Sequence, residues 1–218
     1  MSISDKVKEY LSKIPPYVLL VAATKLRTTE EILEAINAGI KACGENYVQE
    51  AEKKIEIIGN KVSWHCIGHL QSNKIKKAVE LFDVIETVDS FEIAYQIEKR
   101  CSLIGKKIEI LLEINSACEP QKSGILPDTA PAIIEKILNS DFKYVTLAGL
   151  MTMGPVVKDP EDIRPYFKKT CQIFNLFKSD TFKYLSMGMT DSWQIAIEEN
   201  ATVIRIGTGI FGERTLKK

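Results

Sequence analysis

The chain has 218 residues, 45% of them hydrophobic and 27% charged, and its 29 lysines and arginines balance its 29 aspartates and glutamates. This composition is ordinary for a globular protein, and the charge balance disfavours a nucleic-acid or anionic-membrane partner. No run approaches the roughly 18 apolar residues of a membrane span, and the charged N-terminus lacks a signal peptide's apolar core, so a cytoplasmic protein is expected.

Segments with strand-like and helix-like hydrophobic patterns alternate along the chain. The predicted strands cover residues 17–23, 40–45, 62–68, 84–89, 107–115, 144–153, 184–189 and 202–207. The predicted helices cover residues 4–14, 28–39, 47–58, 72–82, 90–105, 127–138, 160–177 and 191–200, with residues 208–218 as a tail. Thr28 and Glu31 make a capping-box pair at the start of the second helix, and Gly105 suits the end of the fifth.

An opening helix followed by eight strands with helices between them predicts one (β/α)8 barrel of the TIM type, a single α/β domain over residues 1–218. An open, doubly wound sheet is the alternative, but no G-x-G-x-x-G follows the first strand. Active sites of such barrels lie at the carboxyl ends of the strands, and phosphate groups often bind beyond the last two. Residues at those ends are therefore the candidates for binding.

The first predicted strand runs into a lysine, in "VLLVAATK". Because side chains alternate along a strand, Val21, Ala23 and Lys25 share one face, and small neighbours leave room for a flat ligand. An amine shielded by apolar neighbours can form a Schiff base with an aldehyde. The alternative is that the strand simply ends and the lysine extends into solvent.

The last two strands end in "SMGMT" and "RIGTG", which place hydroxyl groups beside glycines. Glycine lets backbone N–H groups approach an anion closely, and Ser186 and Thr208 offer hydroxyl donors. The helix expected from residue 191 would point its N-terminus at the same place. Glycines can also merely turn the chain, but two such loops on adjacent strands favour a phosphate site.

Arg205 lies within the last predicted strand, where an unpaired charge is unfavourable. One interpretation is a buried salt bridge, for example to Glu113 or another carboxylate. The other is that its guanidinium, protonated at any relevant pH, donates a hydrogen bond to a pyridine nitrogen and keeps that nitrogen unprotonated. The sequence leaves both interpretations open.

Two further motifs, "GENYVQE" and "WHCIGHLQSNK", bring Asn46 and His65 to the same end of the barrel. His65, Cys66 and His69 could suggest a metal, but a strand-to-loop transition does not gather them as helical spacing would. No metal site is predicted, and His65 is expected to lie near a ring. The five cysteines are widely spaced and contain no C-x-x-C, which favours reduced thiols over disulfides.

With these motifs the chain resembles the pyridoxal phosphate homeostasis proteins, YggS-like or PROSC-like single-domain relatives of the alanine racemase barrel. The resemblance covers nearly the whole chain and rests, in order, on "VAATK", "GENYVQE", "WHCIGHLQSNK", "EPQKSG", "AGLMTMG", "LSMGM" and "VIRIGTGIFGER". It implies that pyridoxal 5′-phosphate (PLP) is the cofactor, held as a Schiff base on Lys25. It also implies that the other site residues surround this cofactor: Ser186, Gly188, Gly207 and Thr208 at the phosphate, Arg205 at the pyridine nitrogen, and Asn46, His65 and Met151 along the pocket.

Three positions depart from the family pattern. Cys66 stands where an aromatic residue is usual, and Gly154 replaces another small residue. Asp191 falls one place earlier than in the common "SMGMS-x-D" form, which puts in doubt a capping role carried over for it.

Three functions compete for this site: a protein that binds, buffers and delivers PLP, an amino-acid racemase, and a Schiff-base aldolase acting on a phosphorylated sugar. Racemisation needs an acid or base on each face of the substrate, and Lys25 serves only one. Related racemases, as the resemblance implies, take the other from a second domain and a dimer partner. The chain is expected to lack that domain; a tyrosine from a loop, such as Tyr47, is an alternative source of this group, but nothing in the sequence singles it out.

An unprotonated pyridine nitrogen would also weaken the ring as an electron sink, and an aldolase would leave Arg205 without a partner ring. We therefore expect a monomeric PLP carrier, with little or no catalysis of its own, that takes part in vitamin B6 homeostasis. PLP-dependent apo-enzymes and amino acids are its expected transient partners.

Overall fold

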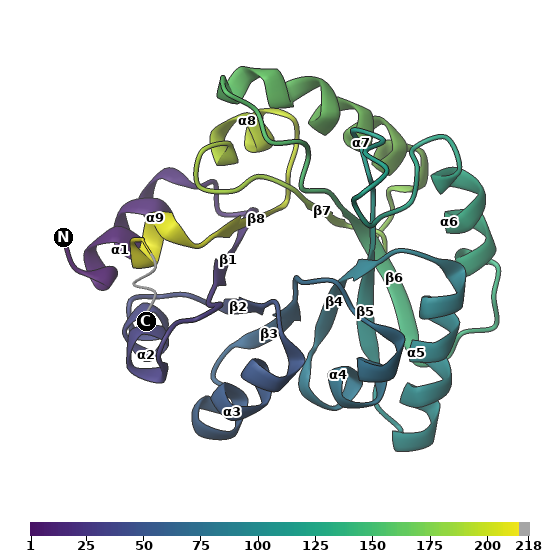
Figure 1. Ribbon diagram of the computed structural model, residues 1–218, viewed down its shortest axis with the longest axis horizontal. Coiled ribbons are helices and arrows are strands. Elements are labelled where there is room, and N and C mark those ends of the chain that lie inside the picture. Colours follow the sequence, from purple (N-terminus) through teal and green to yellow (C-terminus); the bar gives the residue numbers. More distant parts are fainter. Residues whose placement is uncertain (214–218) are drawn as a thin grey trace.

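The computed structural model describes residues 1–213; the remainder of the tail, from residue 214, lies outside the described residues. Eight parallel strands follow one another around a closed barrel, in which β8 pairs with β1. The predicted (β/α)8 barrel is confirmed, and this closure excludes an open doubly wound sheet. Figure 1 shows the helices outside the ring of strands.

The strands are β1 (Leu19–Ala23), β2 (Ala42–Glu45), β3 (Ser63–Cys66), β4 (Val84–Val88), β5 (Ile108–Glu113), β6 (Val145–Met151), β7 (Tyr184–Ser186) and β8 (Val203–Ile206). The α-helices are α1 (Ile3–Lys13), α2 (Thr29–Asn37), α3 (Val48–Ile58), α4 (Ile75–Leu81), α5 (Phe91–Ile104), α6 (Ala130–Leu138), α7 (Arg164–Phe177), α8 (Trp193–Glu198) and α9 (Thr208–Phe211). Two 3₁₀ turns, η1 (Ser72–Lys74) and η2 (Pro160–Ile163), precede α4 and α7.

Local signals set several helix ends as predicted. Thr28 caps α2, and its side chain and that of Glu31 make the reciprocal bonds of a capping box. Gly105 ends α5 in the left-handed conformation, with φ of 68°. The expected helix over residues 160–177 instead begins as η2, because Pro165 in the first turn of α7 has no N–H to donate.

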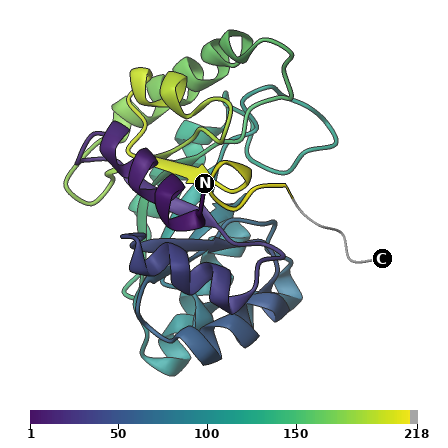
Figure 2. The same ribbon diagram turned by 90° about the vertical axis from the view of Figure 1, so that its left-hand side faces the viewer.

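The added helix α1 packs beside the short helix α9, which the sequence left as part of the tail. The side chain of Tyr10 lies against Gly209, where any larger residue would collide with the tyrosine hydroxyl. Figures 1 and 2 both show α1 next to the yellow C-terminal segment. This contact holds the loop after β8 at the rim of the barrel.

The barrel interior is apolar near the amino ends of the strands and polar near their carboxyl ends. Two small apolar clusters lie inside the barrel: Val21, Ala42 and Val203 in one, and Val84, Leu111, Ala148 and Met151 in the other. Buried His65, Glu86, Ser186 and Arg205 form the polar layer. Among residues 1–213, no helix is long and apolar enough to cross a membrane.

Candidate functional site

A hollow of about 310 Å³ opens at the carboxyl end of the barrel. It contains five of the predicted site residues: Lys25, Asn46, Arg205, Gly207 and Thr208. The other residues of its wall are Ala23, Ile67, Met153, Met189, Thr190 and Asp191. Strand ends that are far apart in sequence thus converge on one cavity, as the barrel topology requires.

Lys25 lies two residues beyond the end of β1 and is half-buried. Leu19 and Val21 belong to the interior cluster, so the predicted alternation brings Ala23 and Lys25 to the inner face. The ammonium group of Lys25 lies 4.7 Å from the centroid of the Tyr47 ring, a cation–π distance. Lys25 thus lines the hollow, while its ammonium group lies over the exposed ring of Tyr47.

A buried ion cluster lies behind the backbone of Lys25. Glu45 is fully buried and its Oε1 accepts hydrogen bonds from the Thr24 hydroxyl (2.5 Å) and from Lys54 Nζ (2.7 Å). Burial raises the pKa of Glu45, an effect that the charge of Lys54 opposes. "GENYVQE" thus supplies Glu45 and Glu50 to this cluster as well as Asn46 to the hollow.

Two hydroxyl groups meet on the side of the hollow formed by β7 and β8. Thr190 Oγ1 lies 3.1 Å from Thr208 Oγ1, and the N–H of Gly209 donates to Thr190 Oγ1 at 3.2 Å. Helix α9 begins at Thr208, so its first N–H groups lie at the same place. Hydroxyl and backbone donors of this kind suit a small oxyanion such as phosphate.

Arg205 is buried beneath these hydroxyls, in the polar layer of the barrel. One terminal nitrogen donates to Ser186 Oγ at 2.6 Å, and the other donates to the carbonyl oxygen of Thr152 at 3.0 Å. Its ion-pair partner, at 3.8 Å, is Glu86, which is a carboxylate other than Glu113, as the sequence allowed. The structure thus contains the buried salt bridge of one interpretation, while the guanidinium also lines the hollow, as the other requires.

Glu86 joins Arg205 to His65. Its Oε1 lies 2.6 Å from His65 Nδ1, and its Oε2 accepts a 2.6 Å hydrogen bond from Ser186. Burial alone would raise the pKa of Glu86, but the hydrogen bond and charge of His65 and the charge of Arg205 together hold it below its ordinary value. Burial lowers the pKa of Arg205, and the negative charges of Glu86 and Glu113 oppose this shift. The positive charge of the guanidinium is therefore balanced by Glu86, and its position is fixed by its hydrogen bonds to Ser186 and Thr152.

Four predicted site residues are not part of the wall of the hollow: His65, Met151, Ser186 and Gly188. The hydroxyl hydrogen of Ser186 is committed to Glu86, so this residue supports Arg205 and has no donor left for a phosphate. His65 is buried against Glu86 within the polar layer. Gly188, with φ of 93°, turns the chain towards α8, where a Cβ would lie 2.5 Å from Ala196 Cβ. Met151 is buried in an interior cluster, and Met153 lines the hollow instead.

The sequence interpretation also missed residues that line the hollow. Thr190 is the last residue of the "SMGMT" motif, four positions after Ser186. Its hydroxyl group, next to a glycine-containing loop, was the signal that could have identified it. Asp191 faces the hollow and makes no capping bond; Ser192 is the N-cap residue of α8. Ile67 and Met189 carry no signal beyond their apolar character.

Metal ligation has no support among residues 1–213, which contain no cluster of three or more histidine, cysteine, aspartate or glutamate side chains suited to an ion. The five cysteines form no disulfide in this structure, and four of them are buried. Burial raises the pKa of Cys66 to about 12, so this thiol stays protonated and is a packing residue. The polar side chains that line the hollow are those of Lys25, Asn46, Thr190, Asp191, Arg205 and Thr208.

Known proteins share this arrangement of strands. A model of the alanine racemase N-terminal domain matches residues 4–215. The pyridoxal phosphate homeostasis protein of Aquifex aeolicus (strain VF5) is 38% identical over 199 residues, which cover 89% of this chain and 86% of the relative. PipY of Synechococcus elongatus PCC7942, solved with PLP bound, is 31% identical with a TM-score of 0.86, covering 97% of this chain and 100% of PipY. Alanine racemase of Clostridium difficile 630 has the same fold, with a TM-score of 0.81, 13% identity, and coverage of 99% of this chain and 57% of the racemase.

Proposed function

Because this chain belongs to the pyridoxal phosphate homeostasis proteins, within the alanine racemase N-terminal-domain family, we propose that it binds PLP in the hollow at the carboxyl end of its barrel. Lys25 holds the cofactor through a Schiff base, and the protein takes part in intracellular PLP homeostasis with little or no catalysis of its own. Residues 1–218 act as one cofactor-binding domain, and as a monomer.

The groups around the hollow fit this cofactor, which combines an aldehyde, a phosphate and a pyridine nitrogen. The amine of Lys25 suits the aldehyde, and the hydroxyls of Thr190 and Thr208 suit the phosphate. A Cβ added at Gly207 would meet only Ala23, at 3.5 Å, and both residues line the hollow. Glycine at this position thus keeps open the space that a phosphate would fill.

Arg205 suits the pyridine nitrogen. Its guanidinium lines the hollow while two of its nitrogens are fixed by Ser186 and Thr152. A cation held there donates a hydrogen bond to the ring nitrogen and disfavours its protonation, so the bound ring is a weaker electron sink. The polar layer therefore favours holding the cofactor over using it for catalysis.

The single observation that carries the proposal is the meeting of Lys25, the Thr190–Thr208 hydroxyl pair and Arg205 around one cavity. The test is to mix the purified protein with PLP, record its visible absorption, reduce with borohydride and locate the adduct by peptide mass spectrometry. We expect a yellow protein whose reduced adduct lies on Lys25. A colourless protein without an adduct would overturn the proposal.

Two variants sharpen this test. K25Q is expected to lose the adduct, whereas K61Q, which removes an exposed lysine before the amino end of β3, should be labelled like the wild type. Labelling of K25Q at another lysine would show that the anchor was misassigned. A separate assay, transfer of PLP from the labelled protein to a PLP-dependent apo-enzyme, tests the delivery role; apo-enzymes that gain no activity would contradict it.

One observation favours the racemase as a second candidate: the Tyr47 ring lies 4.7 Å from the Lys25 ammonium group. A tyrosine in this place could supply the second acid or base. Incubation of the PLP-loaded protein with L-alanine in D₂O distinguishes the two functions. A carrier leaves the Cα hydrogen unexchanged, whereas exchange that disappears in Y47F would establish racemase-type chemistry.

A further inference from the structure

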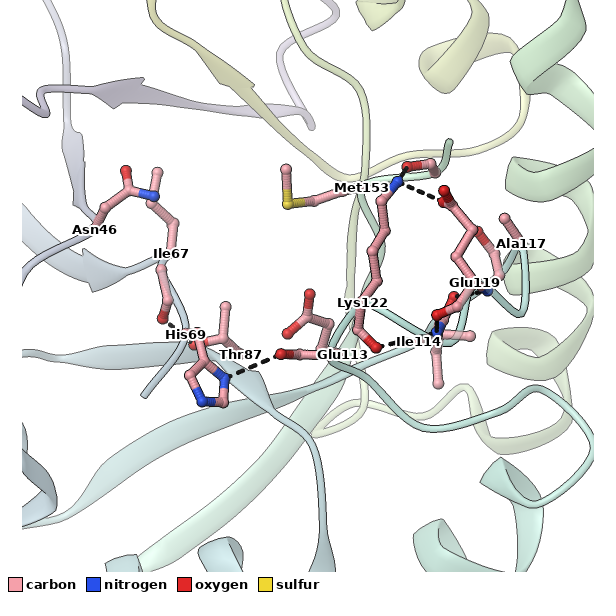
Figure 3. Close-up of a pocket in the computed structure, with 15 residues that line it drawn as sticks. Asn46, Ile67, His69, Thr87, Glu113, Ile114, Ala117, Glu119, Lys122 and Met153 are labelled. Carbon is pink, nitrogen blue, oxygen red and sulfur yellow. Dashed lines mark hydrogen bonds and ion pairs between the residues drawn. The ribbon is translucent and has the colours of Figure 1, made fainter. Parts of the chain in front are cut away.

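A second pocket of about 260 Å³ lies beside the hollow of Lys25, and the two share Asn46, Ile67 and Met153 in their walls. Its far wall is formed by the end of β5 and the loop that follows, and its floor by residues after β3 and by Thr87 of β4. Figure 3 shows the carboxylate of Glu113 pointing into the space between Ile67, Met153 and Lys122. A molecule in this pocket would lie next to the proposed cofactor.

The loop that forms the far wall is held by hydrogen bonds and an ion pair. The side-chain amide of Asn115 donates to the carbonyl oxygens of Glu119 (2.8 Å) and Lys122 (3.3 Å), and its oxygen accepts from the N–H of Glu119 (3.0 Å). Lys122 Nζ pairs with Glu119 at 2.5 Å and donates to the carbonyl oxygen of Gly154 at 3.1 Å. These bonds tie the loop across the pocket to the segment after β6.

Glu113 is the exception among the charged groups of this wall. Its residue is 9% exposed, yet its carboxylate makes no hydrogen bond or ion pair within residues 1–213, and Oε2 is buried without a partner. Burial raises its pKa, while Arg205 and His69 favour the charged form from a distance and Asp89 opposes it. A buried carboxylate without a partner is unfavourable, and a donor that enters the pocket relieves that cost.

The rest of the lining indicates what kind of donor fits. Ile67, Ile114, Ala117 and Met153 make much of the wall apolar, whereas Lys122 is already occupied by Glu119. The Thr87 hydroxyl donates to the carbonyl oxygen of Gly68 at 2.6 Å, and Ser123 lies 3.2 Å from His69. Glu113 is thus a negative group without a partner that lies beside an apolar surface. A ligand with an alkyl chain and an ammonium group complements both features.

We propose that this pocket binds a small primary amine in its ammonium form, with the ammonium group at the Glu113 carboxylate and the alkyl part against Ile67, Ile114 and Met153. Exchange with Lys25 for the cofactor would require the ammonium group first to give its proton to a base such as the Glu113 carboxylate; the neutral amine would then form the Schiff base as Lys25 leaves as a free amine. The exchange with Lys25 rests on the proposed function, whereas binding of the amine to this pocket does not.

The test uses n-propylammonium as the probe and the methyl NMR signals of isoleucine and methionine as the readout, on the cofactor-free protein and on the borohydride-reduced holo-protein. We expect saturable shifts at Ile67, Ile114 and Met153, and n-propanol, which lacks the charge, should bind about tenfold more weakly or worse. Equal binding of the two probes, or no saturable shift, would overturn the proposal without any variant.

Variants give the second comparison. E113Q keeps the shape of the side chain and is expected to bind n-propylammonium about tenfold more weakly, whereas E109Q should bind it as the wild type does. Glu109 lies on the same strand at the opposite end of the barrel, where it pairs with Lys183 at 3.2 Å. Unchanged binding by E113Q would overturn the assignment of the ammonium group.

The two proposals fail separately. Adduct formation on Lys25 tests the cofactor site, and propylammonium titration of the cofactor-free protein tests the amine pocket. Amine binding to a protein that takes up no PLP would contradict the proposed function alone. A PLP adduct on a protein that binds no amine would contradict the further inference alone.

Discussion

The ammonium group of Lys54 lies 2.7 Å from the carbonyl oxygen of Thr24, the residue immediately before Lys25. Lys54 also donates to Glu50 Oε1 at 2.6 Å, and the same oxygen accepts the N–H of Leu26, the residue after Lys25, at 2.6 Å. One charged cluster on α3 thus holds the peptide groups on both sides of Lys25. This fixes the direction in which the amine leaves the backbone, although Leu26 must adopt a φ of 61°.

Replacing Lys54 by methionine should destabilise the protein by about 3–5 kcal/mol, because it leaves the buried Glu45 carboxylate without its cation. The adjacent K53M removes an exposed lysine from the same helix and should change stability by less than about 0.5 kcal/mol. Urea denaturation measures both. Equal stabilities of the two variants would show that the cluster contributes nothing. Folded K54M should also form the Lys25 adduct more slowly.

Two glycines near the hollow should respond in opposite ways to alanine. In G207A the added Cβ meets only Ala23 at 3.5 Å, so the protein should fold normally but bind PLP about tenfold more weakly, since the methyl group occupies the hollow. In G188A the added Cβ would lie 2.5 Å from Ala196 at a φ of 93°, so stability should fall by about 1–3 kcal/mol. Thermal melts and PLP titrations separate the two effects. A G207A protein that binds PLP as the wild type does would remove Gly207 from the proposed phosphate site.

E86Q should lose about 3–5 kcal/mol of stability at neutral pH, because Glu86 is the buried partner of both His65 and Arg205. The pKa of Glu86 lies below its ordinary value of 4.5, so the folded state binds its proton less readily than the unfolded state. The stabilisation is therefore present above pH 4.5 and is lost as pH falls through the folded-state pKa. Denaturation curves across this range should show wild type and E86Q converging in acid. The exposed E92Q is the control, and a pH-independent gap would refute the ion-pair explanation.

The E113Q substitution should change stability in the opposite direction to E86Q. Burial raises the pKa of Glu113 above its ordinary value of 4.5, so the folded state keeps its proton more readily and stability falls as pH rises through the interval between the two pKa values. At neutral pH the cofactor-free E113Q should be more stable than the wild type by about 1–3 kcal/mol, and the difference should vanish below pH 4.5. Urea denaturation at several pH values measures this. Destabilisation of E113Q at every pH would show that the carboxylate has a structural partner.

The local sequence pattern was sufficient to predict the order of strands and helices and the position of Lys25 at the end of the first strand. Apolar runs, the capping box of Thr28 and Glu31, and the αL position of Gly105 depend on neighbouring residues, which the sequence displays directly. Closure of the barrel then brings the strand ends together whatever their separation along the chain. Lys25, Arg205, Gly207 and Thr208 could therefore be assigned to one site without knowledge of their contacts.

How far along the barrel axis a residue lies was harder to predict. The pairing of β5 with β6 skips one residue at Ala148, beside Gly149 with φ of 155°. After this irregularity Met151 faces the interior cluster and Met153 reaches the hollow. Met151 and Met153 are two residues apart and share a face, so they differ in depth along the barrel: Met151 belongs to the interior cluster and Met153 lies nearer the rim.

The sequence by itself determined that this chain forms a (β/α)8 barrel with a lysine, two glycine-containing loops and an arginine at one end, because each signal lies within a few consecutive residues. Only the tertiary structure decided what each polar group contacts. Ser186 bonds to Glu86, 100 positions away, and this pairing turned a predicted phosphate donor into a support for Arg205. Glu113, the partner first suggested for Arg205, faces a separate pocket. Buried polar groups take their roles from the partners that satisfy them, and those partners come from strands that meet only when the barrel closes.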